Sequence, residues 1–123
     1  MLQVGLLFIF GCLGTLCRYG LSKVTLSILA TNFPLGTFVS NILSCIILGV
    51  TMMYFNGKFS ENSLAKLVII TGFCGGFSTF STFSYETVEL LKQGNVTWAV
   101  SNILISVLVG VGLIYFLLIK DKI

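Results

Sequence analysis

The 123-residue sequence has no histidine and very few charged residues, which make up 9% of the chain. Soluble domains carry about 25% charged residues, so this chain cannot cover a water-exposed surface. The lack of histidine excludes histidine-based metal sites and histidine-dependent catalytic triads. The net charge of +3 is spread along the chain without a basic run, which excludes a nucleic-acid-binding patch.

The sequence also lacks the spacing of a disulfide or metal framework. Its four cysteines lie in apolar stretches and form no CxxC pair: Cys12, Cys17, Cys45 and Cys74. We interpret them as small buried hydrophobic side chains. Paired acids, a nucleophile–base pair and a set of metal ligands are absent from the sequence as well, so we do not predict an enzyme.

What the chain has is apolar sequence: 56% of its residues are hydrophobic, and the mean hydropathy is +1.05. A bilayer core about 30 Å thick is crossed by about 20 apolar helical residues. Four stretches qualify, at residues 2–30, 33–55, 67–91 and 96–119. We therefore predict an all-α membrane protein with a single four-helix transmembrane domain over residues 1–123. The first stretch has no leading positive charge and no A-x-A cleavage site, so we expect it to be retained.

Turn signals separate the four stretches. Residues 31–34 end in Pro34, which suits the first turn of a helix, and residues 56–63 and 92–95 are polar. An even number of spans places both termini on one side. The positive-inside bias is slight, because Lys58, Lys66, Lys120 and Lys122 oppose Lys23 and Lys92. Such a weak bias allows insertion in both orientations.

The third stretch has an unusual composition for a membrane helix. Residues 71–86 contain three glycines, six serines or threonines and a carboxylate. Glycine costs a helix about 1 kcal/mol relative to alanine, and hydroxylated side chains compete for backbone hydrogen bonds. We predict that this helix breaks near Gly75-Gly76, where freed carbonyls can bind a cation. Close helix packing through small residues is the alternative role for the glycines.

Rings and hydroxyls alternate after the predicted break. Phe80 and Phe83 are three residues apart and share one helix face, with Ser81, Thr82 and Ser84 around them. An aromatic ring has a positive edge, so two ring edges can solvate an anion without holding it tightly. Hydroxyl groups donate hydrogen bonds that replace lost water. This pattern predicts a path for a small anion.

Other polar side chains lie within the apolar stretches. Asn41 offers amide donors at membrane depth, and Asn102 and Ser106 form an i,i+4 polar stripe on the fourth span. We predict that all three line the fluoride path. Hydrogen bonding between helices is the alternative role for both asparagines. Arg18 is the only arginine; it can attract anions into a vestibule, pair with Glu86, or anchor at the interface by snorkelling.

Three motifs resemble those of Fluc (CrcB-type) fluoride channels. Residues 72–86, GFCGGFSTFSTFSYE, resemble the family signature GFxGGxTTFSTFSxE, which is highly specific. Residues 11–19, GCLGTLCRY, resemble GxxGxxxRY, and residues 34–41 resemble P-x-G-T-x-x-x-N. The departures are small: Ser78 replaces a usual threonine, and Ser44 stands where glycine is common.

The resemblance implies a fluoride-selective channel that exports cytoplasmic fluoride passively and gives resistance to it. It implies an antiparallel, dual-topology homodimer with two pores, in a bacterial inner membrane. Phe80 and Phe83 would form aromatic boxes, with Asn41 and the hydroxyls of Ser81, Thr82 and Ser84 along the fluoride path. A structural sodium ion would be held at the dimer centre by backbone carbonyls of Gly75 and Ser78 from both subunits.

Two other classes of membrane protein fit the length and hydropathy. A small four-helix multidrug or cation antiporter needs a carboxylate in the membrane. The acids here are Glu61, Glu86, Glu89 and Asp121, none of them in the first span. A non-transporting scaffold protein would not need alternating rings and hydroxyls. We therefore keep the channel as the prediction and the antiporter as its alternative.

Overall fold

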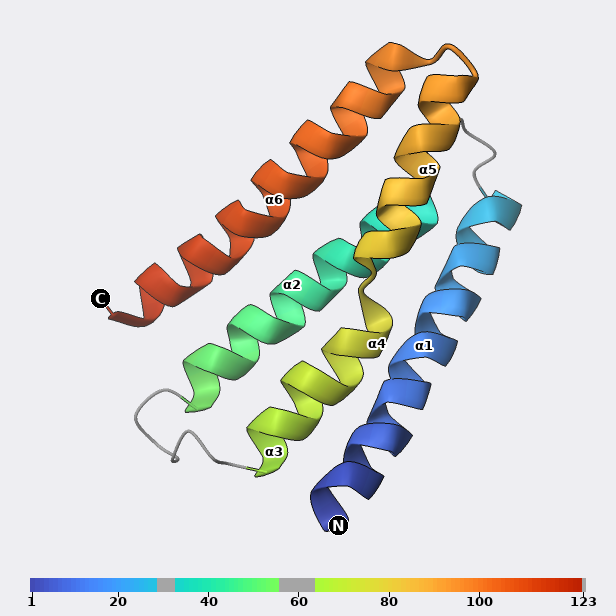
Figure 1. The fold of residues 1–123 in the computed structure, drawn as a ribbon. Coiled ribbons are helices and arrows are strands. Elements are labelled where there is room, and N and C mark those ends of the chain that lie inside the picture. The colour runs from blue at the N-terminus through green and yellow to red at the C-terminus, as the bar shows by residue number, and fades with distance from the viewer. Residues whose placement is uncertain (29–32, 56–63, 123) are drawn as a thin grey trace.

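The computed structural model of the protein describes residues 1–28, 33–55 and 64–122 (Figure 1). Its elements in chain order are α1 (Leu2–Ile28), α2 (Leu35–Phe55), α3 (Leu64–Leu67), the π-helical segment η1 (Val68–Cys74), α4 (Gly75–Phe77), α5 (Phe80–Lys92) and α6 (Val96–Lys122). All of these elements are helical, as the sequence predicts. The turn predicted at residues 31–32 and the loop predicted at residues 56–63 lie outside the described residues.

Four helical spans in the described part of the chain are long and apolar enough to cross a membrane: Leu2–Ile28, Leu35–Phe55, Leu64–Lys92 and Val96–Lys120. The shortest, α2, has 21 residues, or about 32 Å of helix at a rise of about 1.5 Å per residue. This length matches a hydrocarbon core about 30 Å thick. The all-α, four-span fold is therefore confirmed.

Consecutive spans run in opposite directions, so both chain ends lie away from the α5–α6 turn (Figure 1). The second span, α2, packs against α6, α1 and η1. The first span, α1, packs along η1 and α4, whereas α5 packs against α6. The two halves of the third span therefore rest mainly on different neighbours.

The turn between α5 and α6 is made by hydrogen bonds back to the end of α5. The amide of Gly94 donates to Leu91 O at 3.1 Å, and that of Asn95 donates to Leu90 O at 2.8 Å. Gly94 has a φ of 82°, in the left-handed region that favours glycine at a helix C-terminus. The polar separator predicted at residues 92–95 thus forms a tight helix-to-helix turn.

The third span is interrupted, as the sequence predicts. Gly75 keeps helical backbone angles, with φ −62° and ψ −35°. The extended residues come just after it: Ser78 has φ −91° and ψ 160°, and Thr79 has φ −154° and ψ 127°. The break near Gly75-Gly76 is therefore confirmed, with its non-helical residues at Ser78 and Thr79. The π-helical form of η1 has no counterpart in the sequence prediction.

The distribution of side chains is that of a protein surrounded by lipid. Large apolar side chains are exposed, including Phe8 at 73%, Leu108 at 68% and Phe116 at 61%. Several of the most buried side chains are small and polar, such as Ser40 at 0% and Asn102 at 1%. Water would not tolerate such an apolar exterior, whereas a bilayer requires it.

The first span crosses the third at two glycines. A Cβ atom added to Gly14 would overlap Phe73 O and lie 2.8 Å from Phe77 N, and one added to Gly76 would overlap Gly11 O. Nothing lies within 4 Å of a Cβ added to Gly75. Gly76 therefore serves close packing, the alternative raised by its sequence, while neighbouring Gly75 does not.

We expect Gly14→Ala and Gly76→Ala each to lower the apparent unfolding temperature of the purified protein in detergent. The added methyl group meets backbone atoms, and overpacking costs about 1–3 kcal/mol, against a helix-propensity gain of about 1 kcal/mol. The measurement is the loss of monodisperse elution after heating. Gly20→Ala is the matched control on α1, because nothing lies within 4 Å of its added Cβ. An unchanged transition in both test variants would contradict the close crossing.

Candidate functional site

The break in the third span is held by one side chain of the second span. The amide oxygen of Asn41 accepts a hydrogen bond from the Thr79 backbone N–H at 2.8 Å. The amide nitrogen of Asn41 donates to the Thr79 carbonyl at 3.2 Å. One side chain thus satisfies both backbone groups of an extended residue, which cannot bond to water in a membrane.

Thr79 also begins the next helix. Its hydroxyl oxygen accepts from the Thr82 backbone N–H at 3.2 Å, which is an N-cap contact. A second bond joins the Thr79 and Ser81 hydroxyls at 3.3 Å. Our sequence analysis did not single out Thr79. The available signal was a threonine directly before a helix start, where its hydroxyl can accept from the backbone N–H three residues later.

The extended residues change which donors reach the carbonyls before them. In a continuous helix the Thr79 N–H would bond to Gly75 O, but here it bonds to Asn41. The Gly76 carbonyl instead accepts from Arg18 Nε at 3.3 Å. The Cys74 carbonyl still accepts from the Ser78 N–H at 2.9 Å. The break therefore takes the helical donor away from the Gly75 carbonyl.

The residues around the break line an open hollow of about 450 Å³. We call it the break hollow. It is bounded by α2, the two halves of the third span and α6, through Asn41, Ser44, Cys45, Leu48, Ile70, Cys74, Gly75, Ser78, Thr79, Phe80, Phe83, Ser106 and Val107. Besides Asn41, this set contains Phe80, Phe83 and Ser106 of the predicted fluoride path. It also contains Gly75 and Ser78 of the predicted sodium site. The fold therefore brings these residues together.

The two predicted ring residues lie side by side at the N-terminal end of α5. The ring centroids of Phe80 and Phe83 are 6.1 Å apart, with an interplanar angle of 41°. Phe80 is 79% exposed, and Phe83 is half-buried. Phe73 and Phe77 pair separately, with centroids 5.4 Å apart, and Phe77 is 5% exposed. The first pair is thus free to meet a ligand, while Phe77 belongs to the packed interior.

The predicted hydroxyl residues lie on the first turns of α5. Ser81 is exposed, whereas Thr82 and Ser84 are half-buried. Ser81 shares its hydrogen bond with the cap residue Thr79. Their part in a fluoride path stays a prediction.

Asn102 and Ser106 form a hydrogen-bonded chain rather than two free polar groups. The Ser106 hydroxyl donates to Asn102 Oδ1 at 3.3 Å, and Asn102 Nδ2 donates to Thr87 Oγ1 at 3.0 Å. The Thr87 hydroxyl donates in turn to Phe83 O at 2.8 Å. Asn102 therefore links α6 to α5, the alternative role raised by its sequence, while Ser106 also lines the break hollow.

Arg18 contacts the interrupted helix. It is half-buried, and its Nε donates to the Gly76 carbonyl. Among the described residues no ion pair joins it to Glu86. The structure thus gives Arg18 a backbone partner at the break, and its role in a vestibule stays a prediction.

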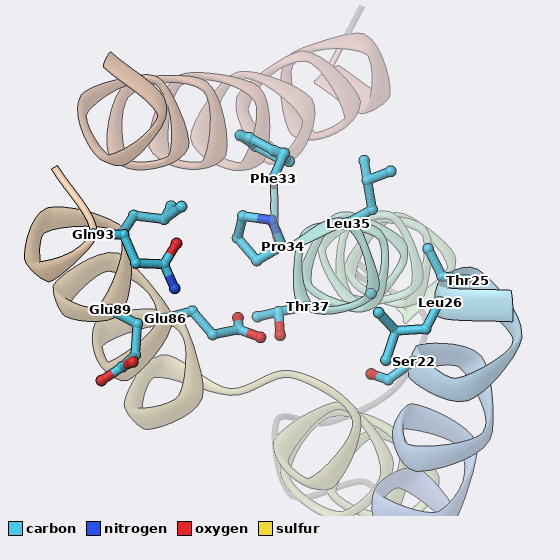
Figure 2. A pocket seen from close by; sticks show the side chains of 12 residues that line it. Ser22, Thr25, Leu26, Phe33, Pro34, Leu35, Thr37, Glu86, Glu89 and Gln93 are labelled. Atoms are coloured by element: carbon cyan, nitrogen blue, oxygen red, sulfur yellow. The ribbon is translucent and has the colours of Figure 1, made fainter. Parts of the chain in front are cut away.

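Glu86, to which the sequence assigns no role beyond a possible partner of Arg18, lies in a separate cavity of about 230 Å³. Figure 2 shows its carboxyl group pointing from α5 toward Thr37 of α2. Ser22 of α1 and Glu89 also line this cavity. The Oε1 atom of Glu86 is buried and has no hydrogen-bond partner among the described residues. Three spans contribute to this cavity, which explains why local sequence did not reveal it.

We expect Asn41→Ala to destabilise the protein strongly, because it leaves the N–H and the C=O of Thr79 without partners. Each unsatisfied buried polar group costs about 1–3 kcal/mol. Asn95→Ala is the matched control, because among the described residues the Asn95 side chain bonds only to the exposed Gln93 side chain, at 3.4 Å. Thermal unfolding in detergent is the measurement. Equal stability of the two variants would mean that Asn41 does not hold the break.

Comparison with known proteins identifies the family. Residues 5–117 match the family described as CrcB-like protein, Camphor Resistance (CrcB). The chain is 42% identical over 113 residues to the Fluoride-specific ion channel FluC of Dehalococcoides mccartyi, covering 92% of this chain and 87% of that protein.

Two further relatives carry the same name. The protein of an Enterobacter species is 42% identical over 109 residues, with 88% of this chain and 85% of that protein covered. The protein of Geotalea daltonii is 44% identical over 101 residues, with 82% of each chain covered. These bacterial relatives and the four apolar spans show a multi-pass bacterial membrane protein. The chain belongs to the CrcB family.

Proposed function

We propose that this chain is a fluoride-specific ion channel, through which cytoplasmic fluoride leaves the cell passively. The observation that carries the proposal is the pair of adjacent rings, Phe80 and Phe83, on the break hollow of a chain whose relatives are named fluoride-specific ion channels. The geometry of the site and the names of the relatives thus independently support the family and the channel function that the sequence predicts. The antiporter alternative has no such support.

The physical basis is weak binding at several sites. The positive edges of Phe80 and Phe83 attract an anion, and the hydroxyls of Ser81, Thr82 and Ser84 replace part of its hydration. A conducting pore needs sites that bind well enough to admit the ion and weakly enough to release it. Ring edges and neutral hydroxyls meet this condition better than a ring of full positive charges would.

The biological role follows from acid–base chemistry. Neutral HF crosses a bilayer and ionises inside the cell, which traps fluoride as the anion. An open, selective pore lets that anion leave down its electrochemical gradient. We therefore propose that the chain gives its cell resistance to fluoride, and that its activity is transport and not catalysis.

The working unit that we propose is an antiparallel homodimer with two pores. In one copy Phe80 is 79% exposed and Gly75 is exposed, although both line the break hollow. A two-fold interface presents the same patch twice, so a second copy would cover these residues. The slight positive-inside bias supports insertion of copies in both orientations.

We further propose that carbonyl groups of Gly75 and Ser78 from both copies hold a structural sodium ion at the centre of the dimer. The residues fit such an ion: both line the break hollow, and the Gly75 carbonyl has lost its helical donor to Asn41. Unwound backbone carbonyls are a known ligand type for sodium in membrane proteins. When bound, the cation would supply positive charge that attracts the negative oxygen ends of these carbonyl groups.

We expect fluoride efflux from liposomes to be passive. No proton or sodium coupling is needed by a path of rings and hydroxyls, so efflux should depend only on voltage and the fluoride gradient. A fluoride-selective electrode measures efflux with and without imposed pH and sodium gradients, with chloride efflux as the comparison. A proton current of fixed stoichiometry would support the antiporter instead, and fluoride moved uphill by sodium would indicate a symporter.

Phe80→Ile and Phe83→Ile should each slow fluoride efflux at least about tenfold, which corresponds to about 1.4 kcal/mol at the barrier. Isoleucine keeps apolar bulk but removes the positive ring edge. Phe77→Ile is the contrasting variant: Phe77 is 5% exposed, so its loss should affect stability more than efflux in the protein that remains folded. Normal efflux from a well-folded Phe80→Ile, Phe83→Ile double variant would remove the rings from the proposed path.

A further inference from the structure

A hydrogen-bonded chain runs behind the break hollow from α6 to α5. The Ser106 hydroxyl bonds to Asn102 Oδ1 at 3.3 Å. Asn102 Nδ2 bonds to Thr87 Oγ1 at 3.0 Å, and the Thr87 hydroxyl bonds to Phe83 O at 2.8 Å. The two end members, Ser106 and Phe83, line the hollow, whereas Asn102 and Thr87 are buried, with 1% and 7% exposed. The chain thus joins two walls of the hollow through residues that do not line it.

The direction of each bond in this chain follows from its last acceptor. A backbone carbonyl can only accept, so the Thr87 hydroxyl gives its single proton to Phe83 O. The Thr87 oxygen must then accept, which turns the amide nitrogen of Asn102 toward it. Asn102 consequently presents its oxygen to Ser106, which gives its hydroxyl proton to that oxygen and not to the hollow. Both polar ends of the Asn102 side chain are therefore engaged.

Phe83 is the residue that this chain holds in place. It belongs to the first turn of α5, which Thr79 caps while bonded to Asn41 of α2. From the other side, Thr87 joins the Phe83 carbonyl to Asn102 of α6. Such a bond between spans persists in a membrane because lipid offers neither group another partner. The turn that carries the Phe83 ring is therefore tied to both neighbouring spans.

We propose that Thr87 and Asn102 are positioning residues for the Phe83 ring, and that they act on fluoride passage through this ring and not by contacting the ion. The proposal rests on the proposed function, because it assigns both residues to an ion channel. Only the edge of an aromatic ring is positive, while its face is negative. The turn that carries the ring therefore decides which of the two meets an anion in the hollow.

Thr51 of α2 provides a matched control. Its hydroxyl donates to Ile47 O at 2.7 Å, the same i−4 bond that Thr87 makes, and its exposed fraction is also 7%. Within the part of the chain that the structure describes, this is the side-chain bond that Thr51 makes, and Thr51 does not line the break hollow. Thr51→Val and Thr87→Val thus remove the same group from the same kind of bond. They differ in the link to Asn102.

The link is measured first without reference to transport, as thermal unfolding of the full chain in detergent. We expect Thr87→Val and Asn102→Leu each to lower the apparent unfolding temperature. The double variant should lose clearly less than the sum of the two, because both substitutions remove one shared bond. Thr51→Val combined with Asn102→Leu should show the full sum, since these residues share no bond. Full additivity of Thr87→Val with Asn102→Leu would overturn the link.

Positioning is then measured as fluoride efflux from liposomes, per folded protein recovered at the elution volume of the unsubstituted chain. Thr87→Val and Asn102→Leu, which break the link from α5 and from α6, should each slow efflux about fivefold or more. Thr87→Ser keeps the hydroxyl and should restore most of the rate, and Thr51→Val should leave the rate unchanged. In a Phe83→Ile protein, Thr87→Val should slow efflux by less than about twofold further, because the ring that it positions is gone.

The outcomes separate this role from a merely structural one and from the proposed function. Equal slowing by Thr87→Val with and without the Phe83 ring would overturn positioning. So would unchanged efflux from both Thr87→Val and Asn102→Leu, or slowing by Thr51→Val as large as that by Thr87→Val. Absence of fluoride efflux from the unsubstituted chain would instead refute the proposed function, and the positioning role with it, whatever the unfolding measurement shows of the link.

Discussion

The pair of hydrogen bonds between Asn41 and the backbone of Thr79 is the interaction on which the rest of the site depends. Extended backbone inside a membrane leaves polar groups that lipid cannot satisfy. A single amide side chain has one acceptor and one donor, which match the one N–H and one C=O of the residue that leaves the helix. The break is stable at this position because α2 supplies both partners there.

Several features of the hollow follow from that pairing. Because the Thr79 amide is turned toward Asn41, the Gly75 carbonyl keeps no helical donor, and the Thr79 hydroxyl is free to cap α5. The cap fixes where α5 begins, and so fixes Phe80 and Phe83 beside the hollow. Arg18 reinforces the other side of the break through the Gly76 carbonyl. The first and second spans thus both provide polar side chains to the interrupted third.

The sequence predicts the spans well because their signal is local: about 20 apolar residues in a row need no knowledge of neighbours. It also places the break to within a few residues, since glycines and hydroxylated side chains weaken a helix wherever they occur. It does not identify Ser78 and Thr79 as the extended residues, because that choice depends on Asn41 and on the approach of Gly76 to Gly11. Asn102 shows the same limit: its partner, Thr87, lies on another span.

The break also makes the rotation of α5 about its helix axis independent of the rotation of η1 and α4 before it. A continuous helix turns about 100° per residue, so a change of residue number in η1 would rotate every later side chain around the axis. The two extended residues, Ser78 and Thr79, interrupt this helical rotation. The hydrogen bonds of Asn41 to Thr79 then fix the rotation at which α5 begins. The angular position of the α5 side chains is therefore independent of the π-helical winding before it. Such a chain can vary the winding of η1 against α1 without rotating the aromatic face of α5.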